Sequence, residues 1–310
     1  MRIAITGALG HIGSALFLKL IKKKNVKKVL LIDNFLTQRY PSLFNLPKNR
    51  KLEFLEADIS KKDLKEKLKN YDFLIHLAAM TDAESSVKNQ KMIKKNNLEG
   101  TRRIAATCAQ LGIKLVFISS TSVYGTQSNI IDEECNNKVL KPQSPYAAIK
   151  IAEENILKKS SKSENLRFTI LRFGTIFGIS KGMRFHTAIN KFCWQASFNT
   201  PITIWRTAYN QKRPYLDLED GINSIIFVIN KDLFNSDIFN ILTINTSVKE
   251  IILLIKNYVN HIKIEYVDSK IMNQLSYEVS NKKIVKKGFT FDGNLKKGVK
   301  NIISHLKISS

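Results

Sequence analysis

Short apolar runs alternate with amphipathic stretches through the first half of the chain. The apolar runs are rich in Ile, Val and Leu and predict strands at Arg2–Thr6, Val29–Asp33, Leu52–Ala57, Phe73–Leu77, Lys114–Ser119 and Arg167–Arg172. Apolar residues at helical spacing predict helices between them, at Ile12–Lys23, Lys62–Lys69, Met92–Leu111 and Tyr146–Lys159. Such repeated βαβ units, joined by right-handed crossovers, predict an α/β fold with a doubly wound parallel sheet.

This rhythm changes after about Gly178. Less regular segments follow, with strand-like runs, a basic loop that extends to Arg213, and helical patterns; they lie at Pro201–Trp205, Lys263–Val267, Leu218–Asn230, Val248–Asn260 and Asn294–Leu306. We therefore expect a first domain at 1–177, with a return segment near 212–235. A smaller α/β lobe, mainly 178–310, is predicted to be discontinuous with it in places.

A glycine-rich turn follows the first predicted strand and opens the first predicted helix. Gly7, Gly10 and Gly13 have the spacing GxxGxxG. Gly7 permits the tight turn, Gly10 lets the backbone approach a pyrophosphate, and Gly13 lets the helix pack on the sheet. The helix N-terminus also offers unpaired N–H groups to phosphates. The context predicts a dinucleotide-binding Rossmann domain; a tight turn without a ligand is the alternative.

Asp33 ends the next predicted strand, twenty residues after the last glycine of the turn. An acidic side chain there accepts hydrogen bonds from the adenosine ribose and repels the 2′-phosphate of NADP. Asn34 follows, and no arginine stands beside them before Arg39, so the sequence favours NAD. Capping of a turn is the alternative role for Asp33. Asp58, before Ile59, suits either the adenine edge or the cap of the next helix.

Tyr146 and Lys150 lie one turn apart near the start of a predicted helix, and therefore on one face of it. A phenol titrates near pH ~10, and a nearby ammonium group together with a cationic nicotinamide ring is expected to lower its pKa. The phenolate could then take a proton from a hydroxyl whose carbon loses hydride. The same spacing also arises by chance on amphipathic helices, so the pair needs support from other residues.

A hydroxyl-rich segment supplies that support. Ser119, Ser120, Thr121 and Ser122 follow one another at the end of a buried-looking strand. Ligands of open α/β sheets bind beyond the carboxyl ends of the strands, so Thr121 or Ser122 could hydrogen-bond the same hydroxyl as Tyr146. A cluster that only caps a turn is the alternative.

In their order, these motifs resemble the extended short-chain dehydrogenase/reductase family, in the NAD-dependent epimerase/dehydratase group typified by UDP-glucose 4-epimerase. The resemblance covers nearly the whole chain. It rests on TGALGHIG at 6–13, Asp33-Asn34, Asp58-Ile59, HLAA at 76–79, Asn97 with Gly100-Thr101, SSTSVYG at 119–125, YAAIK at 146–150, LRFGTIFG at 171–178 and KRPYLDLED at 212–220.

The resemblance implies a set of site residues. Thr121 takes the catalytic Ser/Thr position, Tyr146 is the base, and Lys150 is its partner and holds the nicotinamide ribose. The first domain then binds NAD through Gly7, Gly10, His11, Ile12, Gly13, Asp33, Asn34, Asp58, Ile59, Leu77, Ala78, Ala79, Asn97, Ser119, Tyr146, Lys150 and Phe173. The substrate, bound mainly by the second lobe, contacts Thr81, Ser120, Thr121, Thr175, Arg184, Trp205 and Arg213.

The substrate contacts follow the family less closely. Arg213 stands where relatives bind a substrate phosphate, which an arginine fork suits. Trp205 stands where related epimerases place an aromatic side chain beside the base, although a core Trp is the alternative. Thr175 replaces an Asn of many relatives, and 273–275 reads Asn-Gln-Leu where many carry a phosphate-binding Arg. These departures weaken the transfer of UDP-sugar specificity.

Two further segments, 178–185 (GISKGMRF) and 277–283 (YEVSNKK), are similar to the GDP-heptose 4-dehydrogenase branch, which serves bacterial surface polysaccharides. That similarity makes Arg184 a candidate substrate contact, with a surface role as the alternative.

The resemblance implies oxidation of a nucleotide sugar at C4 by NAD. We predict an NDP-sugar 4-epimerase. A GDP-heptose-like 4-dehydrogenase or keto-reductase, which would use the same Tyr–Lys pair, is the alternative, and a non-catalytic NAD-binding regulator is an alternative of another class. Dehydration is disfavoured, because Thr121 is followed by Ser122-Val123 where dehydratases of the family carry Asp-Glu.

Composition adds few constraints. The formal net charge is +24, but the lysines are scattered and not interleaved with aromatic residues, so we expect compositional bias and no nucleic-acid partner. The positive field would help attract a nucleotide sugar. Three widely spaced cysteines predict neither disulfides nor a metal site. Without a spanning apolar run or a signal peptide, we expect a cytoplasmic protein with no membrane partner. The family further implies a homodimer that pairs the helices predicted at Met92–Leu111 and Tyr146–Lys159.

Overall fold

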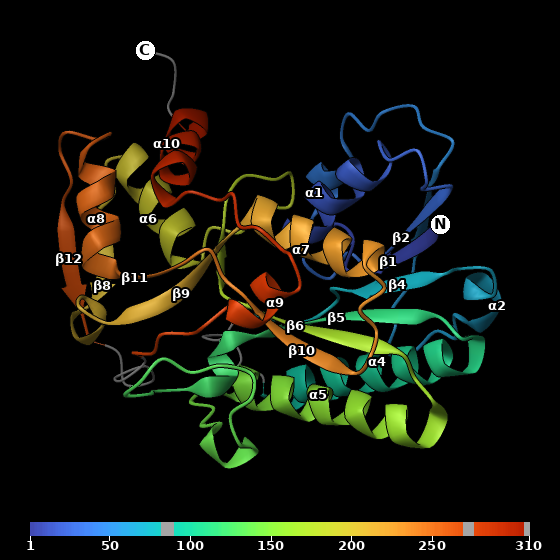
Figure 1. Cartoon of the computed structure of the whole chain (residues 1–310). Helices are drawn as coiled ribbons and strands as arrows, with labels where there is room; N and C mark the ends of the chain where they lie inside the picture. Colours follow the sequence, from blue (N-terminus) through green and yellow to red (C-terminus); the bar gives the residue numbers. More distant parts are fainter. Residues whose placement is uncertain (82–89, 269–275, 307–310) are drawn as a thin grey trace.

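Seven parallel strands form the main sheet of the computed structural model, which describes residues 1–81, 90–268 and 276–306 (Figure 1). Their order across the sheet is β10-β6-β5-β4-β1-β2-β3. The bounds are β1 Arg2–Thr6, β2 Lys28–Asp33, β3 Leu52–Glu56, β4 Phe73–His76, β5 Lys114–Ser120, β6 Phe168–Phe173 and β10 Asp237–Ile241. The first six are the strands expected from the sequence, and the doubly wound parallel sheet is confirmed.

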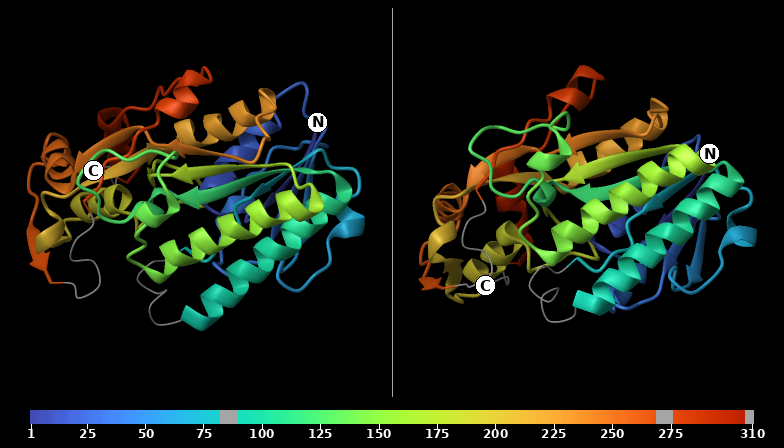
Figure 2. Two further views of the ribbon diagram at one scale, coloured as in Figure 1. Left: turned by 60° about the horizontal axis from the view of Figure 1, so that its bottom comes forward. Right: turned by 90° about the horizontal axis from the view of Figure 1, so that it is seen from below.

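Helices cover both faces of this sheet (Figures 1 and 2). On one face lie α1 and α7, which contact each other; on the other face α4 and α5 lie side by side, with the short α2 next to α4. Their bounds are α1 His11–Leu20, α2 Lys65–Leu68, α4 Gln90–Leu111, α5 Pro145–Glu164 and α7 Leu218–Asn230. Along β1, Ile3 and Ile5 belong to the apolar core under α1 and α7, whereas Ala4 belongs to the opposite core, as the two-residue period of a strand requires.

The chain returns to the sheet further along than the sequence suggests. The return begins at α7 and ends in β10, which pairs with β6, so it spans Leu218–Ile241 and not 212–235. The preceding strand β9, Lys212–Asp217, belongs to the second lobe. The run DIFNI of β10 is too short to predict a strand alone, and its pairing is decided by an edge formed about seventy residues earlier.

In its described residues, the second lobe contains two small sheets and three longer helices. One sheet has the order β11-β9-β7, and β12 pairs with β8 in the other. The bounds are β7 Thr175–Phe177, α6 Ala188–Ser197, β8 Ile202–Trp205, β11 Ile244–Ser247, α8 Val248–Lys256, β12 Ile264–Val267 and α10 Leu295–Leu306. The sequence did not predict α6, β9 or β11, and it extended α8 to Asn260. A short helix that precedes α10 in the chain, α9 Lys282–Lys286, packs against β10.

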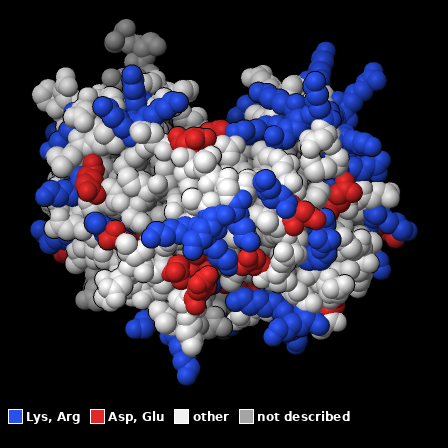
Figure 3. All heavy atoms as spheres, in the orientation of Figure 1, with Lys and Arg blue, Asp and Glu red and all other residues white. Residues whose placement is uncertain are grey.

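Basic side chains are dispersed over the surface. On the face shown in Figure 3, Lys and Arg side chains lie in several separate groups, with acidic side chains between some of them. Among the residues that the structure describes, no helix has both the length and the apolar composition needed to cross a membrane.

Candidate active site

A cavity of about 470 Å³ lies at the carboxyl ends of the central strands and reaches into the second lobe. This is where open α/β sheets bind ligands. It brings together every predicted cofactor and substrate residue except Asn97: Gly7, Gly10, His11, Ile12, Gly13, Asp33, Asn34, Asp58, Ile59, Leu77, Ala78, Ala79, Thr81, Ser119, Ser120, Thr121, Tyr146, Lys150, Phe173, Thr175, Arg184, Trp205 and Arg213.

Asn97 lies behind the cavity wall. Its side chain is buried, and its amide bonds to both backbone groups of Met80, accepting from the N–H at 3.0 Å and donating to the carbonyl at 3.1 Å. It thereby holds the loop after β4, which carries Ala78 and Ala79. Asn97 therefore shapes the cavity from behind, while its neighbour Asn96 lines it.

The three glycines of the turn have different reasons to be glycine. A Cβ on Gly7, whose φ is +67°, would lie 2.6 Å from the backbone nitrogen of Ala78, and one on Gly13 would lie 2.6 Å from the carbonyl oxygen of Ala8. These two positions exclude a side chain because the fold leaves no room. A Cβ on Gly10 would meet only the Gly7 carbonyl oxygen, at 3.3 Å. The space beside Gly10 is thus cavity, and it suits a close-lying phosphate group.

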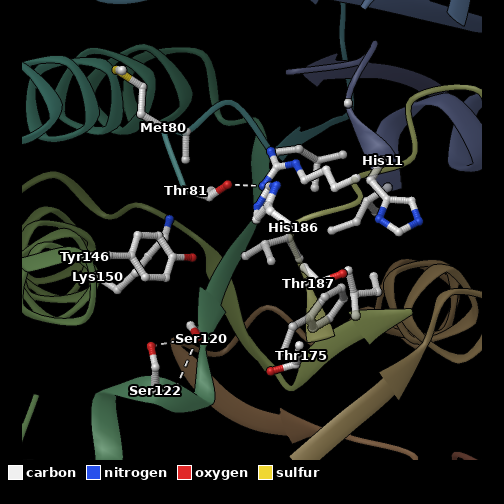
Figure 4. Close-up of a pocket in the computed structure, with 18 of the residues that line it drawn as sticks. His11, Met80, Thr81, Ser120, Ser122, Tyr146, Lys150, Thr175, His186 and Thr187 are labelled. Atoms are coloured by element: carbon white, nitrogen blue, oxygen red, sulfur yellow. Dashed lines mark hydrogen bonds between the residues drawn. The ribbon is translucent and has the colours of Figure 1, made fainter. Parts of the chain in front are cut away.

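The segment 178–184 crosses the glycine turn. His11 Nε2 lies 2.9 Å from the Gly178 carbonyl oxygen, and the Ser180 hydroxyl donates to the His11 carbonyl at 2.8 Å. Burial lowers the pKa of His11 to about 4, so the ring is neutral and donates through Nε2. Arg184, at the end of the segment, donates a hydrogen bond to the hydroxyl of Thr81, and both residues line the cavity. Figure 4 shows Thr81 at the cavity. Arg184 is therefore part of the cavity wall.

Asp33 and Asp58 line the end of the cavity beside β2 and β3, and each also stabilises a turn. Asp33 accepts hydrogen bonds from the backbone N–H groups of Leu9 and Phe35, both at 3.0 Å. Asp58 accepts from the backbone N–H and the hydroxyl of Ser60. Turn capping and cavity lining, which the sequence posed as alternatives, coexist at both residues.

Tyr146 and Lys150 come from the first two turns of α5. The helix starts there because Ser144 caps it by accepting from the Ala147 N–H at 3.1 Å, and Pro145 takes the first position. Lys150 is almost completely buried: Nζ lies 4.6 Å from the ring centre of Phe117 and 6.0 Å from that of Tyr146. In Figure 4 the Tyr146 hydroxyl points into the cavity.

Burial has a larger effect on Tyr146 than the sequence suggests. It raises the pKa of Tyr146, and the charge of Lys150, with weaker help from Arg184 and from hydrogen bonding by Ser120, only partly opposes the rise. In the protein alone, Lys150 therefore does not bring the pKa of Tyr146 below its ordinary value, and the expected lowering depends on the cationic nicotinamide ring as well. Further positive charge in the cavity is needed before the phenolate is stable near neutral pH.

The hydroxyl of Thr121 has partners other than Tyr146. The side chain is buried, and the hydroxyl donates to the Phe173 carbonyl at 3.3 Å and lies 3.4 Å from the Tyr277 hydroxyl. Ser120 is the residue whose hydrogen bonding acts on Tyr146. The chain leaves β5 at Ser120 and enters a 3₁₀ turn, which directs the next side chain towards β6. This geometry favours Ser120 over Thr121 as the hydroxyl that serves Tyr146.

Several cavity residues were missed by the sequence analysis. Tyr277 reaches the site from a segment more than 150 residues after Thr121, and His186, Thr187 and Lys191 come from the start of α6. The segment 277–283 (YEVSNKK) was notable only for its resemblance to another branch of the family, and no local pattern indicated a role for Tyr277. No local pattern marked the start of α6 either.

The charges of the cavity are separated. The cationic lining residues lie near the second lobe and α5; they are Lys150, Arg184, Lys191 and Arg213. Among the described lining residues the carboxylates are Asp33 and Asp58, both at the opposite end. The N-terminus of α6 also faces the cavity through Thr187 and Ala188, and the buried Thr187 hydroxyl has no hydrogen-bond partner among the described residues. This half of the cavity suits an anionic ligand.

Comparisons with known proteins agree on one group. Residues 3–241 match the model of the NAD dependent epimerase/dehydratase family. A Bacillus subtilis protein named as an uncharacterized UDP-glucose epimerase, YtcB, is 30% identical over 250 residues, which is 78% of this chain and 76% of that protein. The dTDP-D-glucose 4,6-dehydratase of Dictyostelium discoideum is 29% identical over 79% of this chain and 58% of its own length.

A solved structure extends the similarity to the whole chain. The UDP-glucuronic acid 4-epimerase from Bacillus cereus, in complex with UDP-glucuronic acid and NAD, has a TM-score of 0.90 and 25% sequence identity. The match covers 99% of this chain and all of that one.

Proposed function

The chain belongs to the NAD dependent epimerase/dehydratase family, and on that premise we propose that it is a nucleotide-sugar 4-epimerase. It is an NAD-dependent enzyme, as the sequence predicts. The observation that carries the proposal is a single cavity in which the Tyr146 hydroxyl lies between a dinucleotide-binding turn and a cationic lobe. In this reaction the sugar is oxidised at C4 to a 4-keto intermediate. The intermediate rotates in the site and takes the hydride back on its opposite face.

NAD fits the end of the cavity beside β1 and β2. Gly10 leaves room for the pyrophosphate, the N-terminus of α1 supplies N–H groups to it, and Asp33 suits the adenosine ribose. Lys150 would hold the nicotinamide ribose. NAD supplies the hydride acceptor, and its positively charged ring adds to the field at Tyr146.

The substrate is placed by charge and shape. We assign the diphosphate to Arg213, Lys191 and the N-terminus of α6, because these supply positive charge and N–H donors away from Asp33 and Asp58. Trp205 is half-buried in the cavity wall at the end of β8, so its ring is available to stack on the base. The sugar then lies towards Tyr146, near Ser120 and Thr175.

The proton transfer is assigned to Tyr146. As phenolate it accepts the proton of the sugar C4 hydroxyl while the carbon loses hydride, and it returns the proton when the hydride comes back. Ser120 hydrogen-bonds this hydroxyl and helps to orient it. The charge of Lys150 favours the phenolate against the effect of burial.

Dehydration, the activity of one relative, is disfavoured by the side chains present. Elimination of water across C5 and C6 needs an acid–base pair near the sugar. The residues after Ser120 are Thr121 and Ser122, so placing the role at Ser120 leaves that conclusion unchanged. The lining carboxylates found in the described part of the chain are Asp33 and Asp58, at the adenosine end.

A 4-dehydrogenase or keto-reductase is the second candidate. The two segments that resemble the GDP-heptose branch bring Arg184 and Tyr277 into the cavity, where they can contact the sugar. A non-catalytic regulator accounts less well for a site in which Tyr146, Lys150 and Ser120 are all in place.

The test is a screen of UDP-, GDP-, dTDP- and CDP-sugars, with the products identified by NMR. An epimer formed without net NADH supports the 4-epimerase. A 4-keto sugar formed with one NADH per turnover identifies the dehydrogenase instead. Protein that holds NAD but converts none of these sugars would contradict both assignments.

Glycine substitutions test the cofactor site. Gly10 has φ −69° and ψ 179°, which alanine tolerates, so Gly10→Ala should keep its thermal stability while losing at least about tenfold in NAD affinity. The matched control is Gly112→Ala, far from the cavity and at φ +67°, which should lose about 1 kcal/mol of stability and bind NAD normally. Calorimetry gives both affinities; normal NAD binding by Gly10→Ala would refute the placement of the pyrophosphate.

We also propose that the protein is a cytoplasmic homodimer. The helices α4 and α5 lie side by side on the outer face of the sheet, where they could pair with the same helices of a second copy (Figure 2). A solution mass of two chains is the expected result.

A further inference from the structure

A completely buried carboxylate holds the catalytic lysine. Glu153 follows Lys150 by about one turn of α5, and its Oε2 lies 3.0 Å from Lys150 Nζ. The side chain of Glu153 is 0% exposed and that of Lys150 is 4% exposed. A buried acid is costly unless it is paired, so this pairing is a specific feature of the site. Neither the glycine turn nor the Tyr146–Lys150 spacing requires an acid at this position.

The other oxygen of Glu153 ends a chain of hydrogen bonds that starts at the sheet. The Thr101 hydroxyl on α4 donates to Oε1 at 2.7 Å and lies 3.2 Å from His76 Nε2. His76 Nδ1 lies 2.7 Å from the Thr6 hydroxyl, which in turn accepts from the Ala78 N–H.

The direction of these bonds follows from their partners. Burial lowers the pKa of His76 to about 3, so the ring is neutral. Because Thr101 donates its proton to the carboxylate, its oxygen must accept from His76 Nε2–H, and Thr6 must donate to Nδ1. Each hydrogen bond of this chain is therefore donated in the direction of Glu153, which matches an ionised carboxylate as the final acceptor.

We propose that Glu153 is a positioning residue of the active site, which fixes Lys150 Nζ beneath Tyr146 and, through its charge, sets the pH at which Tyr146 ionises. The proposal rests on the proposed function, in which Tyr146 transfers the proton. Burial lowers the pKa of Lys150, but the charge and hydrogen bond of Glu153, together with the charges of Tyr146 and Glu154, outweigh it, so the pKa is raised and the lysine stays charged. The same negative charge raises the pKa of Tyr146.

The other groups around this pair do not replace Glu153. Glu154, on the same helix, pairs with the buried Arg172 at 2.7 Å and acts on Lys150 less than Glu153 does, and His76, on β4, is neutral. Arg184, from the segment that crosses the glycine turn, favours the phenolate. Without Glu153, the charges of Tyr146 and Glu154 still favour a charged Lys150. Tyr146 would then face the cations Lys150 and Arg184 without the opposing carboxylate, and should ionise at a lower pH.

Glu153→Gln tests this in the NAD-bound protein. Tyrosine labelled with ¹³C at Cζ reports ionisation by NMR, and Tyr146→Phe assigns the signal. The Tyr146 titration should move to lower pH by more than about half a unit. The alkaline plateau of kcat should fall about tenfold, because Lys150 loses its anchor. An unchanged titration, or one moved to higher pH, overturns the proposal.

Two variants separate charge from packing. Glu99→Gln removes a surface carboxylate of α4 that pairs with Arg102 and Arg103, and should change neither readout. Thr101→Val removes a hydrogen bond but keeps the charge, so it should lower thermal stability and leave the Tyr146 titration in place. A Thr101→Val shift as large as that of Glu153→Gln would make the effect one of packing and overturn the proposal.

The experiment also stands apart from the proposed function. If Glu153→Gln does not fold, Glu153→Met removes the charge with an unbranched apolar side chain and takes the same readouts. A sugar screen in which nothing is converted would refute the proposed function, whereas a titration unmoved by the loss of Glu153 would refute only the role of that residue.

Discussion

Replacing Tyr146 by phenylalanine is expected to lower kcat by about a thousandfold or more while NAD stays bound. The change removes the one oxygen assigned to proton transfer, and general acid–base catalysis contributes an effect of about this size. The ring, which lines the cavity, is kept. The measurements are kcat with the sugar found by the screen and the NAD content of the purified protein.

The pH dependence of the wild type should point to the same group. Burial raises the pKa of Tyr146, and the reaction needs the phenolate, so kcat/KM should rise with pH through the ionisation of this residue.

The matched control for Tyr146→Phe is Tyr124→Phe, which removes a buried hydroxyl bonded to Asn240 and Arg172 outside the cavity lining. It should cost stability and leave kcat within a few-fold of the wild type, and full activity of Tyr146→Phe would contradict the mechanism.

The second large effect is expected at Ser120. Ser120→Ala should lower kcat about a hundredfold, because it removes the hydroxyl that hydrogen-bonds at Tyr146. Thr121→Val keeps the side-chain shape and should lower kcat less than tenfold. It should instead cost about 1–2 kcal/mol of stability, because the Thr121 hydroxyl donates to the Phe173 carbonyl inside the protein.

The comparison of these two variants decides the register of the motif. Measuring kcat and the free energy of unfolding for both separates a role in the reaction from a role in packing. A larger loss of kcat in Thr121→Val than in Ser120→Ala would restore the assignment made from the sequence and refute the one made from the geometry.

Most of the first lobe could be predicted because its signals are local. The first two apolar strands, the glycine turn and Asp33 lie within the first 33 residues, and each has a meaning that neighbouring residues supply. Tyr146 and Lys150 could be recognised because one helical turn places them on the same face. Their family context, rather than their spacing, distinguished them from a chance pair.

The second lobe was harder to predict because its elements depend on distant partners. The strand β9 begins at Lys212, within a stretch that the sequence marked as a basic loop, and it is held between β7 and β11. The strand β10 depends on the edge of β6 in the same way. Short runs of this kind have no preference strong enough to define them without their neighbours.

The sequence by itself determined the parallel sheet, the dinucleotide turn and the Tyr146–Lys150 pair, because periodicity and contiguous motifs specify them. Only the tertiary structure favours Ser120 over Thr121 as the partner of Tyr146 and pairs Glu153 with Lys150. Those choices depend on where a strand ends and on a chain of contacts that joins α5, α4 and β4. Such contacts are set by packing between segments far apart in the chain, and no local pattern carries them.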